Sequence, residues 1–130
     1  MPVENEAPAG LRVAPAGSIP PDPHGTLLTG EKARRIYFIE VTEIDYLQAF
    51  GNYVKIHAGE QEYVRRDTLQ RLSGLLAPLD FARISRSTLL NLRRVRFAER
   101  LDRGAMVFTL ASGTQLVSSR GLRLGSGAVR

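Results

Sequence analysis

The amino-acid sequence predicts a mainly β protein, made of small antiparallel sheets with one short α-helix, and three observations favour this. Short stretches rich in aromatic and β-branched residues recur between residues 36 and 118, as is typical of strands. Turn-forming pairs such as Gly51-Asn52 and Ser112-Gly113 separate those stretches at the spacing of hairpins. Leucine recurs at helical spacing over one segment, between Leu69 and Leu79.

Four strands are expected in the first half of the folded part, each bounded by turn residues. The third strand alternates, with Val54 and Ile56 on one face and Lys55 and His57 on the other. Gly59-Glu60 then forms a turn that returns the chain into the fourth strand. The expected strands are residues 36–39, 44–50, 53–58 and 61–66.

One helix is expected after the fourth strand. Asp67 is a suitable N-cap, and Gln70 follows it at the spacing of a capping box. Pro78 should end the helix near Leu76 or Ala77, because proline has no N–H to donate within a helix. The leucines that share one helical face are Leu69, Leu72, Leu75, Leu76 and Leu79.

The second half returns to strands. A short strand is expected over residues 81–84, followed by a helical turn at Leu89-Leu90. The turns at Asp102-Arg103-Gly104 and Ser112-Gly113 join the remaining strands as consecutive hairpins, so the sheets should be mainly antiparallel. These strands are residues 95–101, 106–110 and 115–118.

The two ends of the chain differ in composition from its middle. Six of the seven prolines lie in the first 30 residues, where apolar residues show no strand or helix period. We therefore expect residues 1–33 to be a disordered tail or linker and residues 34–120 to form the folded domain. Residues 121–130 are glycine-rich and are expected to be loose.

Positive charge is concentrated after residue 30. The chain has 18 Lys and Arg against 13 Asp and Glu, a net charge of +5. Residues 1–30 hold one base and three acids, so residues 31–130 hold 17 bases and 10 acids, a net charge of +7. All but two of those 17 bases are arginine, whose forked guanidinium matches phosphate and guanine edges. This favours a nucleic-acid partner, although a solvated arginine-rich surface explains the charge equally well.

The sequence contains none of the common catalytic signatures. It has no cysteine and two histidines, so no metal site and no thiolate nucleophile is expected. It also lacks a Walker phosphate loop, a dinucleotide fingerprint and a nucleophile elbow. We expect a non-enzymatic protein without a cofactor. The absence of a long apolar stretch or secretory signal predicts no membrane partner and a cytoplasmic location.

Three groups of polar residues could bind DNA. Hydroxyl groups bind phosphate oxygens, and arginine binds either phosphate or guanine. Taken one at a time, each group is explained as well by an ordinary polar loop. The three groups are Asn52, Tyr53 and Lys55 at the first hairpin turn; Arg83, Ser85, Arg86, Ser87 and Asn91 after residue 81; and Ser119 with Arg120 after the last strand.

Taken together, these groups resemble the LytTR family of DNA-binding domains over roughly residues 34–120. Residues 39–57 are similar to the family's opening hairpin, and residues 63–76 to its passage from strand into helix. Residues 81–91 are similar to its most characteristic motif, in which phenylalanine, arginine, an arginine–serine pair and asparagine follow in order. Ser119-Arg120 continues the match.

The resemblance implies a LytTR-like β-fold of a bacterial transcription regulator, in which loops enter the major groove of double-stranded DNA. Two copies bind each direct-repeat promoter site, and the DNA bends. By position, Ser87 and Ser119 are expected to anchor phosphates, whereas Asn91 mainly holds its loop through hydrogen bonds to backbone. The positions that match the family's DNA-contacting residues are Asn52, Tyr53, Lys55, Arg86 and Arg120.

Two departures from the family pattern bear on these expectations. Ser118 and Gly121 replace a hydrophobic residue and a second base, and glycine-rich sequence over residues 121–127 replaces the usual closing helix. Family members commonly carry a receiver or sensor domain upstream, whereas this chain begins with the proline-rich segment. A separate sensor or receiver protein, as in two-component systems, is therefore a further expected partner.

Two alternative functions follow from the same residues. The chain could be a stand-alone protein-interaction module, or an antagonist that occupies the dimer surface of a related regulator. An RNA-binding domain is less favoured, because Tyr53 alone provides no stacking platform. For the DNA-binding function, Arg65 and Arg66 are expected to matter less than Arg86, since their strand should lie well away from the motif loops.

Overall fold

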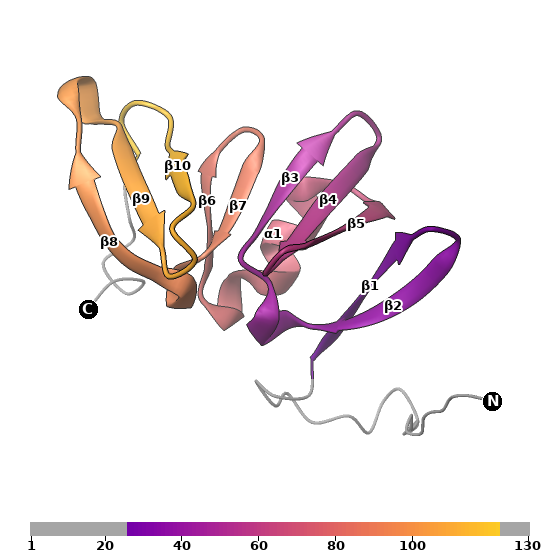
Figure 1. Cartoon of the computed structure of the whole chain (residues 1–130). Helices are drawn as coiled ribbons and strands as arrows, with labels where there is room; N and C mark the ends of the chain where they lie inside the picture. The colour runs from indigo at the N-terminus through magenta and orange to yellow at the C-terminus, as the bar shows by residue number, and fades with distance from the viewer. Residues whose placement is uncertain (1–25, 123–130) are drawn as a thin grey trace.

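The computed structural model describes residues 26–122, which form two antiparallel sheets and one short helix (Figure 1). The first sheet has seven strands in the order β2-β1-β5-β4-β3-β7-β6, and the second has three in the order β10-β9-β8. The prediction of a mainly β fold with antiparallel sheets is confirmed. The strands are β1 Leu27–Lys32, β2 Arg35–Glu40, β3 Tyr46–Phe50, β4 Tyr53–Ala58, β5 Gln61–Arg66, β6 Phe81–Ser85, β7 Thr88–Asn91, β8 Val95–Arg100, β9 Met106–Leu110 and β10 Gln115–Val117.

Strand β1 lies within the segment that was expected to be a tail. Its six residues pair with β2 across a two-residue turn, and Leu28 is buried among the core side chains of the large sheet. Gly30 lets β1 approach β5 closely, because a Cβ at this position would lie 2.8 Å from the Cβ of Tyr63. The expectation of disorder is therefore wrong for residues 27–32. Residues 1–25 lie outside the described part of the chain.

Helix α1 (Leu69–Leu76) covers the core of the large sheet through the predicted leucine face. Leu69, Leu72 and Leu76 are buried, and the chain continues into a 3₁₀ turn over Ala77–Leu79. The N-cap is Thr68 rather than Asp67, since the Thr68 side chain accepts a hydrogen bond from the Arg71 N–H. The predicted capping box is therefore wrong, because Arg71 follows the Thr68 cap at the third position and its side chain cannot accept a hydrogen bond.

A second core joins the two sheets. Ile84 and Leu90 from the β6–β7 hairpin pack with Phe108 and Leu110 of β9, and all four are buried. The helical turn predicted at Leu89-Leu90 is wrong, because these residues belong to strand β7, whose four residues are all buried. Burial on both faces removes the alternation that identifies a strand in sequence.

No helix within residues 26–122 has the length and apolar character needed to cross a bilayer.

Besides the strands and helix α1, the described chain contains short 3₁₀ turns at the junctions between strands. They span Val41–Glu43, Leu92–Arg94 and Asp102–Gly104.

Candidate nucleic-acid interface

Two of the predicted loops lie side by side at one end of the large sheet. Strand β3 pairs with β7, and the Ala49 N–H donates to the Ser87 carbonyl oxygen at 2.9 Å. The β3–β4 turn at Gly51-Asn52 and the β6–β7 turn at Arg86-Ser87 therefore project from neighbouring strands (Figure 1). Gly51 adopts a φ of +61°, which a glycine accommodates without strain.

The third loop is fixed to the second. The Ser119 N–H donates to the Ile84 carbonyl oxygen at 2.9 Å, so residues 118–121 run beside strand β6. Ser118, which departs from the family pattern, is buried; its hydroxyl accepts from the Met106 N–H and donates to the Ser119 carbonyl oxygen. These bonds hold Arg120 next to the β6–β7 turn. We call the three loops, residues 51–53, 85–87 and 118–120, the basic edge.

The β6–β7 turn is braced by its own side chains. The Arg83 guanidinium donates to the Arg86 carbonyl oxygen at 2.7 Å, and the Ser87 N–H donates to the Ser85 hydroxyl at 3.3 Å. The pairing register of the hairpin shifts between Arg83 and Ser85, which marks a bulge. Arg83 and Ser85 therefore shape the turn from which the Arg86 side chain projects.

Some arginines within residues 26–122 bind aspartates, whereas those of the basic edge, like Arg66 and Arg96, do not. Arg71, Arg93 and Arg94 each bind an aspartate at 2.6–2.8 Å. Within residues 26–122, neither Arg86 nor Arg120 forms an ion pair. The three loops themselves contain no acidic residue. The guanidinium groups of Arg86 and Arg120 are thus available to an anionic partner.

Two more predicted residues, Tyr53 and Lys55, lie on strand β4 close to the β3–β4 turn, and they differ in their contacts. The Lys55 ammonium lies 3.5 Å from a Glu62 oxygen and 4.4 Å from the centre of the Phe50 ring. The Tyr53 side chain is exposed at the start of β4. Tyr53 is therefore open to contact, whereas Lys55 would have to exchange an existing partner.

Asn91 lies away from the basic edge, at the other end of β7. Its side chain is buried, donates to the Ile44 carbonyl oxygen at 2.8 Å and accepts from the Arg93 N–H. The expectation that Asn91 holds backbone agrees with this placement. Because the side chain is buried and engaged, we leave Asn91 out of the proposed contact set.

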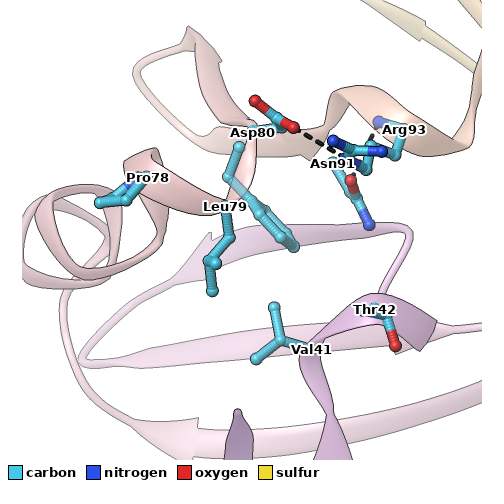
Figure 2. A pocket seen from close by; sticks show the side chains of 8 residues that line it. Val41, Thr42, Pro78, Leu79, Asp80, Asn91 and Arg93 are labelled. Carbon is cyan, nitrogen blue, oxygen red and sulfur yellow. Dashed lines mark hydrogen bonds and ion pairs between the residues drawn. The ribbon is translucent and has the colours of Figure 1, made fainter. Parts of the chain in front are cut away.

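The hollow beside Asn91 has a volume of about 340 Å³ and apolar walls from Val41, Pro78 and Leu79. Figure 2 shows the ion pair between Asp80 and Arg93 at its rim. It lies at the far end of the β6–β7 hairpin from Arg86, so it takes no part in the basic edge.

Arg66 lies beside the basic edge, whereas the sequence led us to expect it well away from these loops. It pairs directly with Tyr53 across strands β4 and β5. Both line an open hollow of about 540 Å³ that also includes Asn52, Gln70 and Arg83. The expectation that Arg66 is well away from the loops is wrong. The tight turn at Gly59-Glu60 was the available signal, since it fixes the register that brings Arg66 opposite Tyr53.

Arg65 has a structural role instead. Its guanidinium binds the Asp67 carboxylate at 2.7 Å and the Thr29 hydroxyl at 2.8 Å, which joins β5 to β1. Hydrogen bonds from Arg71 and from Arg65 hold the pKa of Asp67 well below its ordinary value. The carboxylate therefore stays charged and ties the start of α1 to the sheet.

The fold and the basic edge define a small β domain that gathers unpaired arginines from separate turns at one end. Comparison with known proteins shows to which family this domain belongs. The family model described as the LytTr DNA-binding domain matches residues 34–123, which is more than half of the chain. The chain therefore belongs to the LytTR family of DNA-binding domains.

A solved structure supports the same fold. The LytTr DNA-binding domain of a methyl-accepting/DNA response regulator from Bacillus cereus superimposes with a TM-score of 0.67 at 18% sequence identity. The match covers 72% of this chain and 85% of that chain. No curated protein matches the sequence.

Proposed function

We propose that this DNA-binding domain acts in transcription regulation and reads double-stranded DNA with the three loops of the basic edge. The observation that carries the proposal is that the loops of Arg86 and Arg120 lie side by side, because the Ser119 N–H donates to the Ile84 carbonyl oxygen of strand β6. Neither arginine has a carboxylate partner within the described residues. A DNA partner implies a location in the bacterial cytoplasm.

Two physical effects would act together at this edge. Unpaired arginines displace counterions from the duplex, which gives attraction that is independent of sequence and weakens with salt. Arg86 and Arg120 would then donate to base edges in the major groove, where a good bidentate pair contributes about 1–3 kcal/mol of discrimination. The hydroxyls of Ser87 and Ser119 and the amide of Asn52 would bind phosphates.

A comparison of two arginine variants tests this role. Arg86→Ala should weaken binding to a specific site by roughly fivefold to 150-fold, and binding to unrelated duplex much less. Arg96→Ala is the matched control, because Arg96 is exposed on β8, outside the basic edge. Mobility shifts at fixed salt measure both. Equal losses on specific and unrelated DNA would reduce Arg86 to a phosphate contact, and equal losses for both variants would reject the proposed edge.

We further propose that two copies occupy one promoter site made of direct repeats, and that a separate sensor or receiver protein supplies the signal. One copy offers a single basic edge, so a repeat of the site calls for a second copy in the same orientation. Titration of DNA carrying one or two repeats, followed by the mass of the complex, tests the copy number. A single copy bound to the two-repeat DNA at saturation would contradict it.

A further inference from the structure

The outermost strand of the large sheet carries exposed apolar side chains. Strand β2 ends the strand order, so among residues 26–122 one of its edges has no neighbouring strand. Phe38 is 69% exposed and Ile36 is 60% exposed, while Leu27 on the neighbouring strand is 50% exposed. An exposed apolar edge strand offers both unpaired backbone groups and apolar surface to another strand.

The pairing register places these side chains on one face. Phe38 lies opposite Thr29 and Ile36 opposite Glu31, while Leu27 lies diagonally across from Phe38. The opposite face holds the buried residues, including Ile39. The apolar face of β2 is therefore separate from the core and is continuous along the strand.

The directions of the backbone N–H and C=O groups at the open edge of β2 follow from its pairing with β1. Ala33 and Arg34 have φ values of 53° and 70°, as in a two-residue hairpin turn, and Lys32 pairs with Arg35 across it. Antiparallel strands alternate between bonded and non-bonded pairs, so Arg35 and Tyr37 bond to β1. The N–H and C=O groups of Ile36 and Phe38 then point outwards from the open edge of β2, in the plane of the sheet.

We propose that a second copy of this chain pairs with β2, antiparallel and centred on Tyr37. In this register Ile36 lies opposite Phe38 of the partner subunit, and Phe38 opposite Ile36 of the partner subunit. The two residues with free backbone groups are thus the two with exposed apolar side chains, and each complements the other across the two-fold axis.

The charges at the ends of β2 suit the same arrangement. Arg34 precedes the strand and Glu40 ends it. An antiparallel pair centred on Tyr37 brings Arg34 next to Glu40 of the partner subunit, twice by symmetry. A parallel pair would instead place like charges together. This complementarity is why we choose a second copy rather than an unrelated strand.

This pairing leaves the basic edge free, because β2 and the β6–β7 hairpin lie at opposite ends of the strand order. A two-fold axis turns the two basic edges in opposite senses, whereas direct repeats require the same sense. The β2 pair would therefore join copies bound to separate DNA segments. The inference is independent of which residues read the DNA.

Sedimentation of the full chain without DNA tests the pairing. The wild type should form dimers as its concentration rises, and Phe38→Thr should weaken dimer formation by about tenfold or more, since apolar anchors dominate small interfaces. Phe97→Thr is the matched control, because Phe97 is 50% exposed on β8 of the other sheet. A wild type that stays monomeric at millimolar concentration, or equal losses in both variants, would overturn the proposal.

A charge exchange separates self-pairing from other apolar contact. Arg34→Glu and Glu40→Arg should each weaken the dimer, and the double variant should restore it. Failure of the double variant to recover would reject the antiparallel register. Binding of each variant to DNA with a single site should equal that of the wild type, so these results stand apart from the test of Arg86.

Discussion

The brace between Arg83 and Arg86 allows a quantitative prediction about DNA recognition. Arg83 donates one hydrogen bond to the Arg86 carbonyl oxygen at 2.7 Å, on the surface. A hydrogen bond from a charged donor contributes about 1.5 kcal/mol, less when solvent competes. We therefore expect Arg83→Met to weaken specific DNA binding by about 1 kcal/mol, or roughly fivefold, by loosening the turn.

The prediction becomes specific in a double-mutant cycle. If Arg83 acts only by positioning Arg86, then adding Arg83→Met to Arg86→Ala should cause little further loss. Fluorescence polarisation at one salt concentration measures the four dissociation constants, and Arg93→Met, at the opposite end of the hairpin, serves as the control. Losses that add within about 0.3 kcal/mol would show that Arg83 contacts DNA by itself and would refute the positioning role.

Three further predictions concern the stability of the fold. Gly30→Ala should lower the free energy of unfolding by about 1–3 kcal/mol, because its Cβ would lie 2.8 Å from the Cβ of Tyr63; an unchanged urea midpoint would show that β1 can shift. Asp67→Asn should destabilise the protein at pH 7, and this loss should shrink as the pH falls from the ordinary aspartate pKa of about 4 towards the lower folded value; a pH-independent difference in thermal unfolding would contradict it. Burial lowers the pKa of His57, so stability should fall as the pH drops below the ordinary histidine value of about 6.5, and His57→Gln should flatten that slope in the same assay.

The sequence predicted those elements that carry one buried face. Strand β4 shows why: Val54 and Ile56 are buried while their neighbours are partly exposed, so the two-residue alternation survives in the sequence. The leucine face of α1 is equally legible, since three of its members are buried. A pattern identifies an element when only one side of that element is covered.

The errors occurred where tertiary contacts override local pattern. Strand β7 is buried on both faces, so Thr88 through Asn91 offer no alternation. Strand β1 follows the proline-rich segment and shows no apolar period of its own, whereas its pairing with β2 and the close approach of Gly30 to Tyr63 place it in the sheet. Arg66 was misplaced because its position depends on cross-strand register rather than on its own neighbours. These are properties of pairs of segments, which a reading of single segments misses.

The distribution of carboxylates shows how one arginine-rich chain can keep its structural arginines apart from Arg86 and Arg120, which we propose bind DNA. Asp45 is buried and binds both Arg94 and the Gly59 N–H, so its charge is used to join β3 to the next sheet. Asp67 performs the same task at the start of α1. The loops around Arg86 and Arg120 contain no acidic residue, so folding pairs arginines at the junctions with carboxylates and leaves Arg86 and Arg120 without an ion pair inside residues 26–122. If the same carboxylates stood beside Arg86 and Arg120 instead, the protein would bind phosphate less well although its net charge would not change.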